Sequence, residues 1–329
     1  MSSLLEVKGL KKHFPIQRGF FKKTVGTVKA LDGINLELQH GEVLGLVGES
    51  GCGKSTLGRC LLSLMSITEG EIRLNLNEGE TLNIHDLPSS SMKQYRKNVQ
   101  MIFQDPFSSL NPHMTIFEIL KEPLMLLGDP MSKNELRARV EEIVQLVGLR
   151  PGHLSRYPHS FSGGQRQRIG LARSIITRPS LIVADEPVSA LDVSIQAQIL
   201  NLLKDMQEKY KLAYLFITHD LAVVRYICDR VAVMYLGNIV ETGEKHELLN
   251  NPLHPYTQTL LNSVPKGDGT LGTEEDKQGG ELPDPINLPS GCVFHPRCPH
   301  AQDICKKEVP ELKASGIRSV KCHHATLNV

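Results

Sequence analysis

Hydrophobic positions along the chain follow two patterns, short uninterrupted apolar runs and longer segments in which apolar residues recur every three or four positions. Runs of the first kind occupy residues 42–47, 98–103, 181–185, 212–218 and 230–237. Such runs are typical of strands that a parallel sheet buries on both faces. The sequence therefore predicts a strand at each of these places.

Two intervening segments, 135–149 and 194–209, show the helical pattern, which places apolar side chains on one face. The first stripe consists of Val140, Ile143, Val144 and Val147, and the second of Ile195, Ile199, Leu202 and Met206. Gly148 favours the end of the first helix because glycine readily adopts a left-handed backbone. Since strands and helices alternate, we expect an α/β fold built on a mostly parallel sheet.

The amino-acid composition of the chain limits the kinds of function that we expect for it. The chain has 329 residues, of which 40% are hydrophobic, and its net charge is +1. This charge balance gives no sign of nucleic-acid binding. No run reaches the ~18 uncharged apolar residues that cross a bilayer, and charged residues interrupt the N-terminal segment too early for a signal peptide. We therefore expect a cytoplasmic protein that reaches a membrane only through its partners.

Residues 48–56 form a candidate phosphate loop, because they match the pattern G-x-x-x-x-G-K-[ST] between an apolar strand and a predicted helix over 56–65. Glycines let backbone N–H groups surround phosphate oxygens, and the helix directs its positive end at them. Lys54 is placed to reach the β- and γ-phosphates of ATP, and Ser55 to ligate Mg²⁺. A chance glycine turn is the alternative, and the flanking elements speak against it. The predicted nucleotide-binding residues of the loop are Gly48, Glu49, Ser50, Gly51, Cys52, Gly53, Lys54, Ser55 and Thr56.

A second candidate site lies at the end of the apolar run 181–185, where Asp185 and Glu186 follow each other. The carboxyl end of a parallel strand faces the ligand crevice in folds of this kind. We expect Asp185 to hold the Mg²⁺ shell and Glu186 to polarise the attacking water. Solvated acids at an exposed strand end are the alternative.

The tetrapeptide Ser162-Gly163-Gly164-Gln165 opens a predicted helix over 164–176, whose first amides are suited to bind a phosphate. By itself it is equally a glycine turn that caps a helix. Placed between the phosphate loop and the two carboxylates, it resembles the signature motif of ABC ATPases. In that family the phosphate belongs to ATP held by the opposite subunit.

Three further segments fit this resemblance. Gln104 resembles the Q-loop glutamine, which contacts Mg²⁺ and relays to the membrane domain. Asp192 ends a segment similar to the D-loop, which crosses the dimer interface. His219 resembles the switch histidine, which contacts the γ-phosphate and completes a catalytic set with Glu186 and Lys54.

The resemblance also implies an aromatic ring stacked on adenine. Phe14 lies at the corresponding place, and Phe20 and Phe21 are rival assignments because the segment that follows is long. Packing in the core is an alternative role for each of these rings.

The resemblance covers residues 4–248 and implies an ABC nucleotide-binding domain over 1–248, with a RecA-like core, an antiparallel β-subdomain and a helical subdomain at about 105–175. Two such subunits would enclose two ATP molecules. Because the phosphate, Mg²⁺ and base positions all match the family, we expect a competent ATP hydrolase.

Residues 250–265 and 281–312 resemble the C-terminal extension of dipeptide and oligopeptide uptake ATPases, most closely the second ATPase subunit of the dipeptide systems. The resemblance implies a related ATPase as partner, two transmembrane permease subunits and a periplasmic peptide-binding protein. It also implies a peripheral position on the cytoplasmic face of the inner membrane. Nickel, haem-precursor and antimicrobial-peptide transport are alternatives within the family, and a soluble ABC ATPase is an alternative outside transport.

Four cysteines gather near the C-terminus in the spacing C-x5-C-x6-C-x16-C. Four thiolates are able to hold a [4Fe–4S] cluster or a tetrahedral zinc ion, and a lobe without metal is a third possibility. The absence of C-x2-C weakens the zinc-finger interpretation, and the family resemblance favours the cluster. We therefore expect an extension and linker over 249–290 and a metal-binding lobe over 291–329, with the ligands Cys292, Cys298, Cys305 and Cys322.

Overall fold

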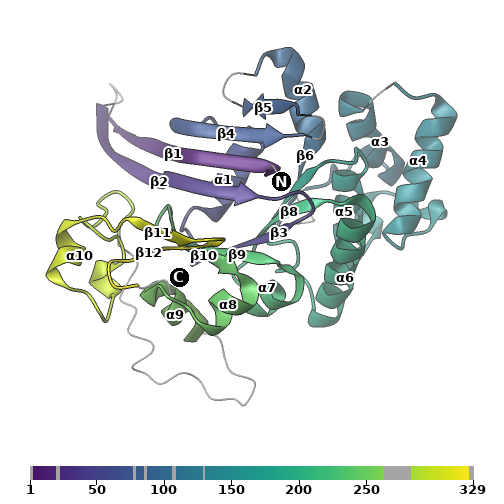
Figure 1. Ribbon diagram of the computed structural model, residues 1–329. Helices are drawn as coiled ribbons and strands as arrows, with labels where there is room; N and C mark the ends of the chain where they lie inside the picture. The colour runs from purple at the N-terminus through teal and green to yellow at the C-terminus, as the bar shows by residue number, and fades with distance from the viewer. Residues whose placement is uncertain are drawn as a thin grey trace. The chain divides into compact units, whose positions relative to one another are not determined.

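The computed structural model of the chain forms two compact units, each assembled from several segments (Figure 1). The first unit comprises Met1–Glu6, Glu37–Val43 and Arg73–Ile217, and the second comprises Val7–Leu36, Leu44–Ile72 and Thr218–Val329. The residues that the structure describes are 3–19, 23–76, 79–84, 87–105, 109–128, 130–262 and 283–325.

The first unit contains a parallel sheet with the strand order β8-β7-β6. Its strands are β6 (Val99–Ile102), β7 (Leu181–Asp185) and β8 (Ala213–Ile217). Every residue of β7 and β8 is buried, as the uninterrupted apolar runs predict. Beside this sheet, β5 (Thr81–Asn83) pairs antiparallel with the end of β4 (Glu69–Asn75).

The helices of the first unit are α2 (Ser89–Asn98), α3 (Ile116–Leu127), α4 (Lys133–Leu146), α5 (Gly163–Ile175) and α6 (Val193–Tyr210). Short 3-10 turns at Pro151–His153 and Pro158–Ser160 connect α4 to α5. Helices α3, α4 and α5 pack against one another (Figure 1).

Capping boxes fix where α3 and α4 begin. The Thr115 and Ser132 side chains accept hydrogen bonds from the backbone N–H groups of Glu118 and Glu135, whose carboxylates bond back to the cap residues. The apolar stripe predicted for α4 is buried, and Gly148 has a φ of 74° just beyond the helix. Both features of this helix were therefore predictable from local sequence.

The stripe predicted for α6 is partly wrong. The buried residues of this helix are Ile199, Leu200, Leu203 and Met206, whereas Ile195 and Leu202 are only half-buried. The core lies on the side of Leu203, whose carbonyl accepts a hydrogen bond from the buried Tyr214 hydroxyl of β8 at 3.3 Å. Apolar spacing alone does not show which edge of a stripe faces the sheet.

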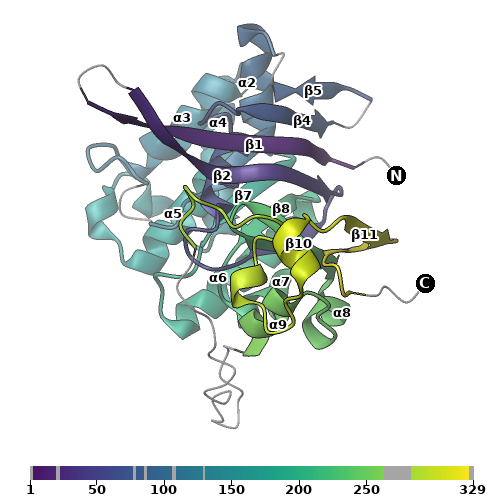
Figure 2. The ribbon, with the colours of Figure 1, turned by 90° about the vertical axis from the view of Figure 1, so that its left-hand side faces the viewer.

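The second unit contains the sheet order β11-β12-β10-β9-β3. Its strands are β3 (Val43–Val47), β9 (Arg230–Tyr235), β10 (Asn238–Glu244), β11 (Leu312–Ser315) and β12 (Arg318–Lys321). Strands β3 and β9 are parallel, and the other pairs are antiparallel. The C-terminal hairpin β11–β12 therefore extends the sheet beyond β10 (Figure 1), and β11 is the outermost strand (Figure 2).

The remaining elements of the second unit surround this sheet. Two long neighbouring strands, β1 (Leu5–Arg18) and β2 (Lys23–Leu38), lie mostly in this unit. The helices are α1 (Lys54–Leu61), α7 (Leu221–Ile227), α8 (Lys245–Asn250), α9 (Pro255–Asn262) and α10 (Asp303–Lys307), with a 3-10 turn at His295–Arg297. Helix α1 begins two residues before the predicted start and ends at Leu61 rather than near Met65.

An aromatic cluster joins α9 and the C-terminal residues to strand β9. The ring centroid of Tyr235 lies 4.6 Å from that of Tyr256 and 5.2 Å from that of Phe294, and the Tyr256 and Phe294 centroids are 5.5 Å apart. All three side chains are almost completely buried. These contacts fix the segment after residue 290 onto the second unit.

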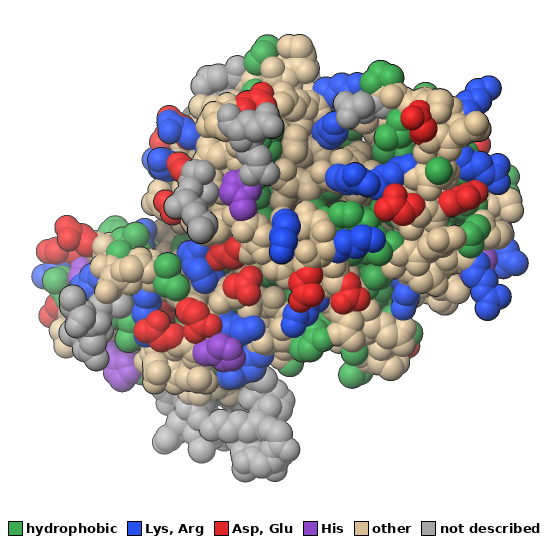
Figure 3. Space-filling view, turned by 45° about the vertical axis from the view of Figure 1, so that its right-hand side comes forward, with side chains coloured by type: hydrophobic (Ala, Val, Ile, Leu, Met, Phe, Trp, Pro, Cys, Tyr) green, Lys and Arg blue, Asp and Glu red, His purple; other side chains and the backbone are tan. Residues whose placement is uncertain are grey.

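The surface is mixed in charge. Basic and acidic side chains are interspersed over the face shown in Figure 3, as the net charge of +1 leads one to expect. Within the described part of the chain, no helix combines the length and the apolar character needed to cross a membrane.

Candidate functional site

The phosphate loop joins β3 to α1 in the second unit, and two of its glycines are sterically required. A Cβ atom on Gly48 would lie 2.1 Å from the Met234 carbonyl oxygen, and one on Gly53 would lie 2.4 Å from the Ala30 carbonyl oxygen. Gly53 also has a φ of 111° and serves as the N-cap residue of α1. The loop therefore passes closer to β9 and β2 than any side chain permits.

Lys54 and Cys52 occupy the interior of this loop. The Lys54 ammonium is buried and donates to the Gly48 and Glu49 carbonyl oxygens, at 2.8 Å each. The Cys52 carbonyl accepts from the Gly237 N–H at 2.9 Å. Burial raises the pKa of the Cys52 thiol, so its sulfur stays protonated and packs the loop. Lys54 is the group in this part of the loop with the charge to bind a phosphate.

His219 lies beside the strand that enters the phosphate loop. The preceding residue, Thr218, donates its backbone N–H to the Leu46 carbonyl of β3 at 3.2 Å. The following residue, Asp220, caps α7 by accepting from the Ala222 N–H at 2.7 Å. His219 itself is exposed. This backbone contact places the predicted switch histidine beside the end of β3, the strand that leads into the phosphate loop.

Glu186 occupies a strained position in the first unit. Asp185 is buried at the end of β7, and Glu186 has a φ of 46°, a left-handed backbone that residues other than glycine rarely adopt. Such conformations cost about 1–3 kcal/mol and cluster at functional sites. The Glu186 N–H donates to the Ile217 carbonyl of β8 at 2.9 Å, which holds the backbone in place.

Gln104 contacts Glu186 directly. Its side-chain Nε2 donates to Glu186 Oε2 at 2.8 Å, although the two residues are 82 positions apart. The structure therefore brings together two residues that sequence analysis selected separately. A carboxylate held by an amide donor keeps one oxygen oriented, which suits a group that must position a water molecule.

The signature segment 162–165 begins α5 as predicted, one residue earlier than expected. Ser162 and Gln165 form a capping box, in which Gln165 N–H donates to Ser162 Oγ at 3.4 Å and Ser162 N–H donates to Gln165 Oε1 at 3.1 Å. One turn on, Gln167 donates to the Pro187 carbonyl at 2.6 Å, which ties the helix to the loop after Glu186.

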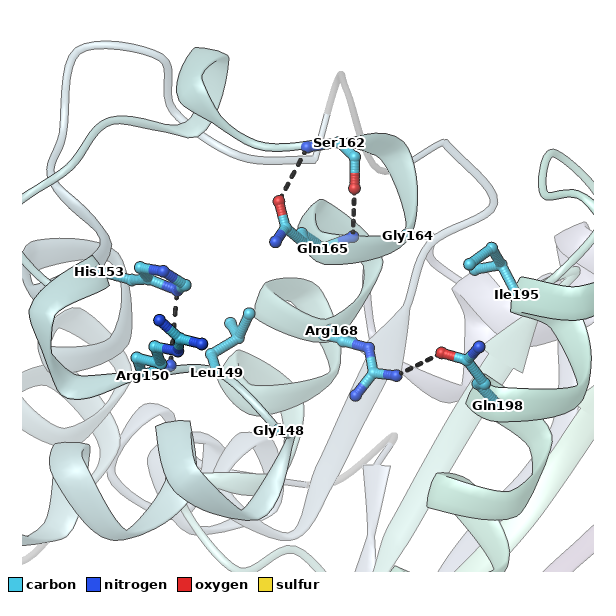
Figure 4. Close-up of a pocket in the computed structure, with 10 residues that line it drawn as sticks. All are labelled: Gly148, Leu149, Arg150, His153, Ser162, Gly164, Gln165, Arg168, Ile195 and Gln198. Carbon is cyan, nitrogen blue, oxygen red and sulfur yellow. Dashed lines mark hydrogen bonds between the residues drawn. The ribbon is translucent and has the colours of Figure 1, made fainter.

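A cavity of about 450 Å³ opens beside this segment (Figure 4). Arg168 crosses it, donating to the Val147 carbonyl at 2.7 Å and to Gln198 Oε1 at 2.9 Å. The cavity is lined by Gly148, Leu149, Arg150, His153, Ser162, Gly164, Gln165, Arg168, Ile195 and Gln198. Basic side chains next to helix-terminal amides give it a chemistry suited to an anion.

Asp192 begins α6 and is exposed. Its carbonyl accepts from the N–H groups of Ile195 and Gln196 at 2.9 and 2.8 Å. Ser189, which starts the D-loop-like segment, donates through Oγ to the Glu186 carbonyl at 3.1 Å. A chain of contacts therefore runs from Glu186 to the start of α6 within the first unit.

The adenine-stacking assignment stays a prediction. Phe14 lies on β1, half-buried, with the Lys12 ammonium 4.9 Å from its ring centroid. Its rivals Phe20 and Phe21 lie outside the described residues.

The predicted metal site of the C-terminal lobe is not supported. Among the described residues, which include all four cysteines, no three ligand side chains form a group able to hold a metal ion. Burial raises the pKa of the Cys292 and Cys298 thiols, and the neighbouring cysteines raise each further. The described residues therefore give no support for a [4Fe–4S] cluster or a zinc ion in this lobe.

The cysteines instead contribute to packing. The Cys292 N–H donates to the Cys305 carbonyl at 2.8 Å, and Cys305 Sγ lies 3.4 Å from His324 Nε2. Cys322 packs with Val320, Ala325 and Leu253 in a small apolar cluster. The spacing of the cysteines places all four in one lobe, but the described residues form no group of three side chains able to hold a metal ion.

Sequence analysis missed two residues that contact the phosphate loop. Arg297 and Tyr256 both bond to Glu49, from 248 and 207 positions away. Each lies in a segment already recognised as part of the C-terminal extension, but neither matches a motif with a known spacing to the loop.

Comparison with known proteins places these features in context. The family described as "ABC transporter" matches residues 31–189, and "Oligopeptide/dipeptide transporter, C-terminal region" matches residues 240–305. The chain is 54% identical to the oligopeptide transport ATP-binding protein AppF of Bacillus subtilis, over 98% of this chain and 97% of that protein. It is 46% identical to the dipeptide transport ATP-binding protein DppF of Escherichia coli, over 97% of this chain and 93% of that protein.

The fold also resembles solved structures. A dimeric structure of the ATP-binding cassette MJ0796, in a post-hydrolysis state bound to ADP and Pi, matches with a TM-score of 0.63 and 28% identity. This match covers 73% of the present chain and 98% of the cassette. The cbiO1 protein of Clostridium perfringens, part of the ABC transporter complex cbiONQ, matches with a TM-score of 0.62 and 26% identity, over 76% of this chain and 92% of that one.

Proposed function

Because the chain belongs to the ABC transporter family, we propose that it is the ATP-hydrolysing subunit that powers a peptide importer. The observation that carries this proposal is the match of residues 240–305 to the C-terminal region of oligopeptide and dipeptide transporters, in the same chain as the ATP-binding cassette. Relatives named for peptide transport share about half of the sequence over nearly its whole length.

In this proposal the residues selected from the sequence take the following roles at the nucleotide. Lys54 of the phosphate loop binds the β- and γ-phosphates, and His219 contacts the γ-phosphate. Ser55, Gln104 and Asp185 hold Mg²⁺, which neutralises charge on the phosphates. Glu186 orients the attacking water and accepts its proton, a role that the contact between Gln104 and Glu186 supports.

The segment 162–165 acts in the opposite subunit. The helix-terminal amides of α5 and the basic cavity beside them would bind the γ-phosphate of ATP held by a second, homologous ATPase, with Asp192 at the shared interface. The similarity to a dimeric cassette supports this arrangement. Two permease subunits and a periplasmic peptide-binding protein would complete the transporter, with this chain peripheral on the cytoplasmic face of the inner membrane.

Growth of an amino-acid auxotroph on dipeptides tests the proposal. A strain that carries Glu186→Gln should fail to grow on a dipeptide and grow normally on the free amino acid, since ATP turnover falls by about 100-fold or more without the general base. Glu141→Gln, which changes a half-buried carboxylate paired with Arg137 on α4, is the matched control and should leave growth unchanged.

The same strains separate the alternative substrates. If Glu186→Gln spares dipeptide growth but abolishes uptake of longer peptides, nickel or a haem precursor, the motor assignment stands and the substrate changes. If the variant retains normal ATP turnover in the assembled transporter, the catalytic assignment is wrong.

A further inference from the structure

The C-terminal lobe contacts the phosphate loop at Glu49. Arg297 Nη1 donates to Glu49 Oε2 and Nη2 donates to Oε1, both at 2.9 Å. This bidentate arrangement is the strongest form of an ion pair between side chains. The Arg297 side chain is only 9% exposed and that of Glu49 26%, so water screens the pair weakly.

Arg297 is itself held in place by the aromatic cluster. Its Nη1 donates to the Tyr235 hydroxyl at 3.4 Å, and its guanidinium lies 5.7 Å from the Tyr235 ring centroid and 5.9 Å from that of Phe294. Both rings attract the cation. The hydrogen bonds to Glu49 raise the pKa of Arg297 further above its ordinary value. The guanidinium is therefore fixed and permanently charged.

Tyr256 holds the backbone of the same residue. The Glu49 N–H donates to the Tyr256 hydroxyl at 2.9 Å, and the Glu49 carbonyl accepts from Lys54 at 2.8 Å. Burial raises the pKa of Tyr256, so its hydroxyl remains neutral and able to accept. Backbone and side chain of Glu49 are thus both bound by residues that follow the ABC cassette in the sequence.

We propose that Arg297 of the C-terminal lobe and Tyr256 of the preceding extension are positioning residues for ATP, which together fix the phosphate loop and neutralise the Glu49 carboxylate. The inference rests on the proposed function, because it concerns the binding of that nucleotide. An unpaired carboxylate in a loop that receives phosphates repels them. ATP affinity therefore depends on a lobe that lies outside the cassette.

Nucleotide titration of the purified full chain tests this role. Arg297→Ala should weaken binding of MgATP about tenfold, the scale expected when a largely buried carboxylate loses its partner. In the Arg297→Ala background, Glu49→Gln should restore most of the affinity, because it removes the unpaired charge. High salt should also reduce the defect. Unchanged binding by Arg297→Ala, or a double variant no better than the single, overturns the proposal.

Arg318→Ala is the matched control. Arg318 lies in the same lobe, its side chain is 11% exposed, and it pairs with Glu241 and Glu247 away from the loop. This change should lower the melting temperature without altering ATP affinity. Equal losses of affinity in Arg297→Ala and Arg318→Ala would assign the effect to folding of the lobe and overturn the positioning role.

Two further measurements keep the test decisive. If Arg297→Ala does not fold, Tyr256→Phe provides a second test. This change removes the oxygen that accepts from the Glu49 N–H and should weaken ATP binding about threefold. Unchanged affinity overturns the role of Tyr256.

In the assembled transporter, Arg297→Lys should raise KM for ATP and leave kcat close to native. Failure of the native chain to bind ATP at all would count against the proposed function, before any variant is compared.

Discussion

The phosphate loop and the signature segment are both glycine-containing turns that open a helix, yet they are held in different ways. The signature segment is fixed locally, by a capping box between Ser162 and Gln165. The phosphate loop is fixed from a distance, by Gly237, Tyr256 and Arg297. The difference implies that damage to the first should stay local, whereas the second should respond to changes throughout the C-terminal part of the chain.

Gly48→Ala should produce the largest effect, on both the stability of the chain and its binding of ATP. The added Cβ would overlap the Met234 carbonyl oxygen, so the loop must move away from β9. We expect a loss of about 3 kcal/mol or more in the free energy of unfolding, together with loss of ATP binding. Chemical denaturation and nucleotide titration measure the two effects.

Gly51→Ala is the control within the same loop. Its φ is 79°, but no atom lies within 4 Å of an added Cβ. The substitution should therefore cost only about 1–2 kcal/mol of conformational strain. Equal effects at the two glycines would show that close approach to β9 does not fix the loop.

Protonation of His254 at acid pH should produce the next largest loss of stability. Burial lowers the pKa of His254 from 6.5 to about 4, and its Nδ1 accepts from the Tyr256 N–H at 3.0 Å. The unfolded chain thus binds a proton at a higher pH than the folded chain. The stabilising contribution is complete above about pH 6.5 and is lost as the pH falls towards 4.

Between pH 7 and pH 5 this difference amounts to about 2 kcal/mol of unfolding free energy. Denaturation of the native chain at the two pH values measures it. His254→Asn should flatten the pH dependence, because its amide does not titrate. A variant with the native pH slope would show that other groups control acid stability.

Ser162→Ala should produce the smallest effect on stability. Loss of the cap costs about 1 kcal/mol, as is usual for an N-cap serine. ATP affinity of the isolated subunit should not change, because the segment is proposed to bind the nucleotide of the opposite subunit. Thermal denaturation and titration measure both.

Thr115→Ala in α3 removes the same kind of capping box outside any motif. It should cost a similar amount of stability and leave ATP turnover of the assembled transporter intact, whereas Ser162→Ala should reduce turnover. If both variants lose turnover equally, the signature serine acts only as a cap.

The sequence predicted those parts of the structure that depend on residues close together in the chain. The strands 181–185 and 213–217 and the stripe of α4 follow from apolar spacing, because burial on one or both faces imposes that spacing directly. The stripe of α6 was misplaced because neighbouring positions 199, 200 and 203 are all apolar. Periodicity does not show which of these positions face the core. The structure shows that the core lies on the side of Leu203, whose carbonyl accepts a hydrogen bond from the Tyr214 hydroxyl.

The same distinction holds within the candidate site. The capping box of the signature segment joins residues only three positions apart, and the φ of 111° at Gly53 is a local reason for glycine at that position. The contact of Arg297 with Glu49 depends on a fold that joins positions 248 apart, and single-sequence spacing carries no information about it. Cysteine spacing likewise suggested a metal site that the described geometry does not support.

The hairpin β11–β12 has a consequence for the solubility of shortened forms of the chain. Strand β12 pairs with β10 at Glu241 and Thr242 and covers that part of the edge of β10. The outer strand β11 is only 4 residues long and carries Lys313, which makes it a poor template for further strand pairing. Truncation before the hairpin would expose the longer edge of β10, and the shortened chain would self-associate through it.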